Sequence, residues 1–330
     1  LMSEPLGLAE MVEEPVVLIE AQRAGPSTGM PTKTEQADLE HVLYTSQGDS
    51  TRIVLAPANP MEAYEQTRQA FEIAYGYNIP VIILYDQKVG GEYRNIDESF
   101  FDRDADPSMP ATLTEAEIAE TEHHATGLFK RYLYDAEDGV SPRSIPGQKG
   151  GRHLVTGNEH NEEGHIVETP ELRVTQMDRR RGKLSVIRDH LDAQESNQTT
   201  FGPDDADYGI ITWGSQQGTV REAVERMNAD GASVKGLGVS DIMPFPAKEM
   251  EAFLDSVDEA LVVEMNASGQ FRHHIQRELG RYGEKLYSLL KYDGEPFVPA
   301  EIVDGFETRI DGGIDTRPQF NTRMESAAGD

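Results

Sequence analysis

Short apolar runs alternate with longer amphipathic stretches in the first hundred residues. The apolar runs predict buried strands because they are short, rich in β-branched residues and bounded by proline or polar residues; they lie at 16–20, 52–56 and 80–86. Before the third run, apolar and small residues recur every three or four positions, which predicts a helix over 60–77. Asn59 can cap this helix and Pro60 can begin it. Strand–helix–strand order predicts a parallel sheet.

A second region repeats this alternation from residue 207 onward. Strands are predicted from the runs YGIITWG, SVKGLGV and EALVVEM, and helices over 216–228, 247–257 and 269–279. Regular β-α-β-α-β-α order over about a hundred residues is typical of one compact α/β domain.

The remaining segments carry weaker patterns. We expect short helices at 1–13, 35–43 and 113–124, a charged helix at 176–197, a long ordered excursion at 135–170 and a disordered tail at 308–330. The predicted division is 1–100 for a first domain, 101–203 for the excursion and connecting helix, 204–300 for a second domain and 301–330 for a polar tail.

The most distinctive chemistry follows the first strand. The loop over 22–33 offers a guanidinium, three hydroxyls and glycine N–H groups, namely Arg23, Ser27, Thr28, Thr32, Gly25 and Gly29. Such donors at the carboxyl end of a strand suit a carboxylate or a phosphate. Turn geometry and a surface ion pair would explain the same residues equally well. The spacing matches neither common phosphate-binding glycine motif.

The net charge excludes some classes of partner. The chain has 59 acidic and 30 basic residues, a formal charge of −29. That surface repels nucleic acid and anionic lipid. The acidic residues are scattered through every predicted helix, which favours the coat of a protein from a high-salt cytoplasm over a binding surface for a basic partner.

Cysteine is absent. No disulfide can form, and the chain offers no thiolate for an iron–sulfur cluster. No apolar run approaches the length of a membrane span, and the first residues lack the pattern of a signal peptide. We therefore expect a cytoplasmic protein.

The segment QRAGPSTGMPTKTEQADL resembles the signature of the alpha subunit of 2-oxoacid:ferredoxin oxidoreductases, which are thiamine-diphosphate enzymes. Further blocks resemble the family in the family's order: DGVSPRSIPG, TGNEHNEEGH, WGSQQGTVREA, PFP, VVEMNASGQF and KYDGEPFVPAEI. The resemblance covers most of the chain and is weakest over 100–130 and 301–330.

The resemblance implies an α/β fold in two parts, an incomplete pyrimidine-binding domain and a domain like the C-terminal domain of transketolase. It implies that Arg23 and Thr32 bind the 2-oxoacid, with Gly25, Ser27 and Thr28 in the same loop. A guanidinium can hold a carboxylate through two parallel hydrogen bonds. In the family an upstream segment contacts thiamine, so we expect an N-terminally truncated chain without catalytic residues of its own.

The family reaction is the oxidative decarboxylation of a 2-oxoacid to acyl-CoA with reduction of ferredoxin. By resemblance, thiamine diphosphate is shared with a beta subunit, which carries Mg and the iron–sulfur cluster; the other partners are ferredoxin, coenzyme A and the substrate. Pyruvate and 2-oxoglutarate both remain open. The alternatives are a non-catalytic subunit of the same fold and a transketolase-like enzyme.

Glu159 and His160 belong to a block that lies near the active centre in the family. The resemblance therefore implies that they support the substrate or close over it. Simple solvation of a loop is the favoured interpretation of the two residues. The His spacing of this block matches no zinc template, so no metal site is predicted.

Overall fold

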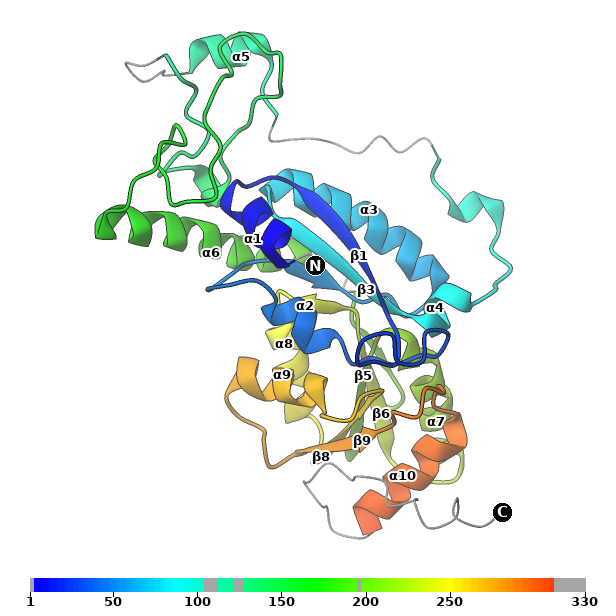
Figure 1. Cartoon of the computed structure of the whole chain (residues 1–330). Coiled ribbons are helices and arrows are strands. Elements are labelled where there is room, and N and C mark those ends of the chain that lie inside the picture. The colour runs from blue at the N-terminus through cyan, green and yellow to red at the C-terminus, as the bar shows by residue number, and fades with distance from the viewer. Residues whose placement is uncertain (1–2, 104–111, 122–126, 195–196, 312–330) are drawn as a thin grey trace.

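The structure is a computed structural model that describes residues 3–103, 112–121, 127–194 and 197–311 (Figure 1). Its elements form two sheets with helices around them. Those of the first half are α1 (Ser3–Met11), β1 (Val16–Gln22), α2 (Leu39–Tyr44), β2 (Ile53–Leu55), α3 (Pro60–Tyr77), β3 (Pro80–Asp86), α4 (Gln87–Gly91), η1 (Glu98–Phe100), α5 (Glu115–Glu120), η2 (Glu137–Gly139) and α6 (Pro170–Asp192).

The first sheet has the order β1-β3-β2-β7. Its first three strands are parallel, as the sequence predicted, and Val16 pairs with Pro80 while Gln22 pairs with Asp86. The carboxyl ends of β1 and β3 therefore lie side by side. Asn59 caps α3 as expected, because its side-chain oxygen accepts from the backbone N–H groups of Met61 and Glu62.

The second half supplies the other sheet and the strand that completes the first. Its elements are β4 (Thr199–Phe201), β5 (Tyr208–Trp213), η3 (Gly214–Gln216), α7 (Gln217–Ala229), β6 (Val234–Val239), β7 (Asp241–Met243), α8 (Ala247–Asp255), β8 (Glu259–Glu264), α9 (Gln270–Leu279), β9 (Leu286–Leu290) and α10 (Pro299–Asp311). The second sheet has the order β4-β6-β5-β8-β9.

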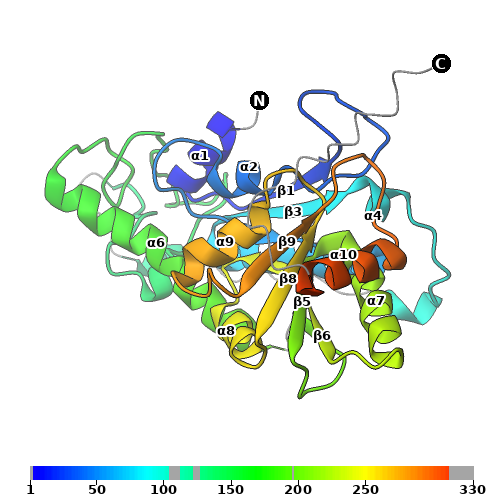
Figure 2. The same cartoon turned by 90° about the horizontal axis from the view of Figure 1, so that it is seen from below.

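Helices cover both faces of the second sheet, α8 and α9 on one side and α7 and α10 on the other (Figure 2). Alternate residues of β5 serve the two sides: Ile211 packs in the cluster with Phe253 and Phe271, and Ile210 packs in the cluster with Val220 and Ile302. In this sheet β6, β5, β8 and β9 are parallel, whereas β4 pairs antiparallel with β6 at the edge. The α/β domain predicted for this region is confirmed.

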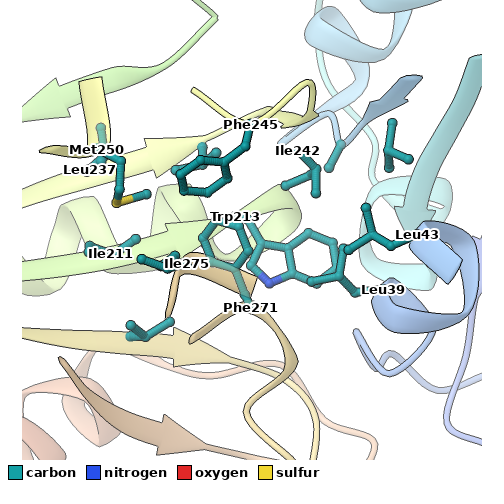
Figure 3. Close-up of a cluster of buried hydrophobic side chains, with 14 of the residues drawn as sticks. Leu39, Leu43, Ile211, Trp213, Leu237, Ile242, Phe245, Met250, Phe271 and Ile275 are labelled. Carbon is teal, nitrogen blue, oxygen red and sulfur yellow. The ribbon is translucent and has the colours of Figure 1, made fainter. Parts of the chain in front are cut away.

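One hydrophobic cluster joins the two halves. Trp213 ends β5 and lies between Phe271 of α9 and the α2 residues Leu39 and Leu43 (Figure 3). The tryptophan is 1% exposed. The same cluster includes Ile82 of the first sheet. The carboxyl ends of the two sheets are thus held against each other by apolar burial.

Several boundaries differ from the expectations. Helix α2 begins at Leu39 rather than at 35, because the backbone N–H groups of Thr34 and Gln36 donate to the carbonyl oxygens of Gly294 and Met265 instead of forming a helical turn. Helix α6 begins at Pro170 rather than at 176. The tail expected from 308 is helical as far as Asp311, where the described residues end.

The excursion begins earlier than the predicted residue 135: residues 127–169 have little regular structure. Buried charged side chains hold this segment against the rest of the fold. At the end of α1, the Glu13 carboxylate accepts hydrogen bonds from Arg179 Nη1 at 3.0 Å and Lys183 Nζ at 2.6 Å. Arg131 of the excursion donates to the Glu13 carbonyl oxygen at 2.6 Å. This buried charge cluster, Glu13 with Arg131, Arg179 and Lys183, joins α1, the excursion and α6 at the amino end of β1. Burial lowers the pKa of Lys183 to about 8.

Candidate functional site

The loop after β1 folds back on itself as a small hairpin. Ala24 and Met30 form an antiparallel bridge, and the Met30 N–H donates to the Ala24 carbonyl oxygen at 2.8 Å. Gly29 has φ +48°, and a Cβ there would stand 1.8 Å from that oxygen. Only glycine fits this position. The GPSTG spacing is therefore needed to close the hairpin.

The structure brings the predicted substrate-binding residues onto this one loop. Arg23 precedes the bridge and Thr32 follows it, while Gly25, Ser27 and Thr28 form its tip; all five are exposed. Within the part of the chain that the structure describes, the Arg23 guanidinium makes no ion pair or hydrogen bond. A cation and hydroxyls thus face solvent together, which suits an anionic ligand.

The segment after the loop carries a residue that the sequence reasoning missed. Glu35 is largely buried, and its carboxylate accepts a hydrogen bond from the Gly25 N–H. Burial, with the nearby carboxylates of Asp38 and Asp293, raises the pKa of Glu35 to about 7. Burial also raises the pKa of Asp38, which Arg23 opposes. The sequence predicted a short helix over 35–43, and no pattern in it indicated that Glu35 is buried.

Gln36 locks the same segment to the second sheet. Its side chain is fully buried, donates to the Trp213 carbonyl oxygen at 2.9 Å and accepts from the Met265 N–H at 3.0 Å. Its backbone N–H donates to the Met265 carbonyl oxygen at 2.6 Å. Asn266 donates to the Gln36 carbonyl oxygen at 3.2 Å. The loop therefore leaves β1 and is anchored on the ends of β5 and β8.

A second polar cluster lies at the carboxyl end of β3. The Ser215 hydroxyl donates to Asp86, and Lys88 Nζ donates to the Ser215 carbonyl oxygen at 2.9 Å and to Thr219 Oγ1 at 3.1 Å. Burial raises the pKa of Asp86 and lowers that of Lys88. Lys88 and Ser215 line a cavity of about 370 Å³ between the two sheets. Sequence reasoning missed this cluster, because its members come from both halves of the chain.

The structure does not bring Glu159 and His160 to the Arg23 loop. Glu159 forms ion pairs with Arg173 and Arg180 of α6, and the His160 ring packs against Tyr132 with ring centres 4.1 Å apart and ring planes tilted by 58°. Both sit beside the buried charge cluster, at the amino end of β1, whereas Arg23 follows its carboxyl end. A strand of this length separates them by about 20 Å. Neither residue is simply a solvated loop residue, and their predicted place beside the substrate stays a prediction.

The described residues limit where a metal or cofactor could bind. Among them, no group of three or more His, Asp or Glu side chains is arranged to hold a metal ion. Arg23 and the loop hydroxyls fit a small carboxylate, but they do not fit a metal-bound diphosphate, which needs oxygen ligands for the metal. Over the same residues, no helix is long and apolar enough to cross a membrane.

Comparisons with known proteins agree with the resemblance. Residues 1–179 match the family described as pyruvate flavodoxin/ferredoxin oxidoreductase, thiamine diP-bdg, and residues 206–302 match pyruvate:ferredoxin oxidoreductase core domain II. The subunit alpha of 2-oxoacid:ferredoxin oxidoreductase 2 from Aeropyrum pernix is 30% identical over 95% of this chain and 47% of its own length. The 2-oxoglutarate synthase subunit KorA from Methanothermobacter thermautotrophicus is 31% identical over 92% of this chain and 76% of its own length.

A solved structure is also similar. The 2-oxoglutarate:ferredoxin oxidoreductase from Magnetococcus marinus, with 2-oxoglutarate, coenzyme A and succinyl-CoA bound, superposes with a TM-score of 0.75 at 32% identity, over 93% of this chain and 50% of that one. The chain spans about half the length of the Aeropyrum pernix relative and of this structure. The family predicted from the loop sequence is confirmed: the chain belongs to the alpha subunits of the 2-oxoacid:ferredoxin oxidoreductases.

Proposed function

We propose that this chain binds the carboxylate of a 2-oxoacid in an enzyme that oxidatively decarboxylates the 2-oxoacid to acyl-CoA and reduces ferredoxin. The observation that carries the proposal is the Arg23 guanidinium, exposed beside the loop hydroxyls and without an ion pair to any described residue. Its planar fork matches a carboxylate through two hydrogen bonds. Thr32, at the other end of the hairpin, adds a hydroxyl donor.

The rest of the active centre is assigned to partners. We propose that thiamine diphosphate is shared with a beta subunit, which holds Mg and the iron–sulfur cluster, since this chain has no Cys and its described residues offer no metal-ligand set. Ferredoxin and coenzyme A act through the assembled enzyme, which we place in a high-salt cytoplasm. The similar Magnetococcus marinus enzyme, described with 2-oxoglutarate bound, supports 2-oxoglutarate as the first substrate to test beside pyruvate.

The experiment is the Arg23→Lys substitution in the assembled enzyme. An ammonium keeps the charge but cannot offer the two-point fork, so kcat/KM for the 2-oxoacid falls by roughly ten- to a hundredfold. Thr32→Val gives a smaller loss of the same kind. Melting temperature and subunit assembly stay at the wild-type level, because Arg23 is exposed and makes no described contact that folding needs.

The control is Arg226→Lys on α7, an exposed arginine whose ion pair with Glu222 is made at 2.5 Å within the helix. It undergoes the same chemical change at a site remote in sequence and leaves kcat/KM unchanged. An Arg23→Lys enzyme with wild-type kcat/KM but a lowered melting temperature would make Arg23 a brace of the loop. The proposal would then fail, and a non-catalytic role for the chain would be favoured.

A further inference from the structure

The Arg23 loop touches a turn that lies far away in the sequence. The turn 293–295 follows β9, and the Thr34 N–H donates to the Gly294 carbonyl oxygen at 3.2 Å. Lys33 forms an ion pair with Glu295. Gly294 itself has φ +83°, and a Cβ there would stand 2.3 Å from Met30 Cε and 3.0 Å from Lys33 Cβ. The turn is therefore pressed directly against the end of the hairpin.

Glu35 holds the other side of the hairpin. Its carboxylate accepts from the Gly25 N–H at the tip, while the backbone on either side of it is fixed: Thr34 by Gly294 and Gln36 by Met265. Glu35 is 8% exposed and Gln36 is fully buried. The loop that carries Arg23 thus has one covalent end on β1. Its non-covalent anchors are Met265 and Gly294 of the second half, and Gln22 of β1, whose side-chain oxygen accepts from the Asp38 N–H at 3.1 Å.

Because the hairpin is exposed, these anchors decide where it stands. A hairpin without these anchors would sample many positions, and binding the substrate would then cost the entropy of ordering it, which weakens binding. Glu35 lies near the carboxylates of Asp38 and Asp293, so it does not attract an anionic substrate. Glu35 therefore contributes by holding the hairpin in position and not by attracting the substrate.

We propose that Glu35 and the turn 293–295 are positioning elements that set the Arg23 loop for the substrate carboxylate, so that the second α/β unit serves substrate binding without touching the substrate. This inference rests on the proposed function of Arg23. It gives a task to the second unit, for which the sequence indicated only a fold. At Gly294 the φ of +83° disfavours other residues, and an added Cβ would press on the side chains of Met30 and Lys33.

The test substitutes Gly294→Ala and uses Gly231→Ala as the matched control. Gly231 also has a positive φ, +96°, but no atom lies within 4 Å of the Cβ that would be added. Both variants carry the same backbone strain, and only the first pushes on the hairpin. We expect amide hydrogen exchange at Met30 and Thr34 of this chain to accelerate by about tenfold in Gly294→Ala and to be unchanged in Gly231→Ala.

In the assembled enzyme, Gly294→Ala should raise KM for the 2-oxoacid by about tenfold with kcat changed much less. Glu35→Ala, which removes the acceptor for Gly25, should do the same, whereas Glu35→Gln keeps an acceptor oxygen and stays near wild type. If Gly294→Ala does not fold, KM and hydrogen exchange of the two Glu35 variants provide the test. The inference is overturned if amide hydrogen exchange in the loop is unchanged in both Gly294→Ala and Glu35→Ala. It is also overturned if Gly231→Ala accelerates this exchange as much as Gly294→Ala does.

The Arg23→Lys enzyme separates this inference from the proposed function. Where Arg23→Lys lowers kcat/KM but Gly294→Ala and Glu35→Ala leave KM unchanged, only the positioning role is wrong. Where Arg23→Lys has no effect on kcat/KM, the proposed function fails as well, whatever the hydrogen exchange shows. Faster exchange without a change in KM would mean that the anchors hold a loop with no part in substrate binding, which also overturns the inference.

Discussion

The buried charge cluster at the amino end of β1 makes a sharp prediction for Glu13→Gln. The Glu13 side chain is 1% exposed and is surrounded by the cations of Arg179, Lys183 and Arg131. These cations hold the pKa of Glu13 well below its usual range, although burial opposes them. The glutamine removes the one negative charge of the cluster and leaves three buried cations without a counter-ion.

Removing one partner of a buried ion pair costs about 3–5 kcal/mol of unfolding free energy. For a chain larger than 250 residues, each kcal/mol lowers the melting temperature by roughly 2 °C, so Glu13→Gln should melt about 6–10 °C below wild type. Glu14→Gln is the matched control. The Glu14 side chain is 54% exposed and pairs with Arg143 at 3.3 Å. An exposed pair contributes less than about 1 kcal/mol, so its loss lowers the melting temperature by about 2 °C at most.

The assay is thermal unfolding at fixed salt from pH 5 to pH 9. Because the folded-state pKa of Glu13 is depressed, its contribution is fully present above its unfolded pKa of about 4.5 and is lost only as pH falls further. Without Glu13 the pKa of Lys183 falls further, so this lysine becomes neutral at a lower pH in Glu13→Gln than in wild type. The gap in melting temperature between the two proteins should therefore be widest near pH 5, narrow as pH rises toward the wild-type Lys183 pKa of about 8, and stay constant above it. Equal losses in Glu13→Gln and Glu14→Gln would refute the reasoning.

Further predictions concern Glu35 and the acidic surface. Because burial raises the Glu35 pKa to about 7, folding takes up a proton between pH 4.5 and 7, and stability falls as pH rises through that window. The melting temperature of Glu35→Gln should therefore equal that of wild type at pH 5 and exceed it at pH 8. The same difference in melting temperature at both pH values would contradict this prediction. With a charge of −29, the melting temperature should rise with KCl into the molar range, as the Debye length shrinks from about 10 Å at 0.1 M to about 3 Å at 1 M. A melting temperature that does not change with KCl would indicate that the acidic residues form a binding surface for a partner.

Local sequence signals predicted those elements whose stability is local. The apolar run at 80–86 became β3, and Asn59 caps α3 through the hydrogen bonds that its residue type suggests. The short strand β7 was not predicted. Its three residues form a strand only because β2, nearly two hundred residues away in the sequence, offers an unpaired edge. No pattern within Asp241–Met243 carries that information.

The candidate site shows the same division. Arg23 and the hydroxyls could be found because the loop sequence is unusual, and the structure keeps them together on one hairpin. The reason for Gly29 is a distance of 1.8 Å to a backbone oxygen, which only the closed hairpin reveals. Glu35 looks like an ordinary acidic residue of a polar stretch until Met265 and Gly294 fix the backbone beside it.

The two halves of the chain therefore contribute differently to the position of the Arg23 loop. The first sheet supplies the strand from which the loop leaves, and this part is visible in the sequence as an apolar run followed by a break. The second sheet supplies the anchors on Gln36 and Thr34, which come from β8 and from the turn after β9. Trp213 and α2 seal the space between them with apolar side chains. A substitution in the second half can consequently alter 2-oxoacid binding without touching the loop, and a chain that kept only the first sheet would retain Arg23 but lose the geometry that makes it useful.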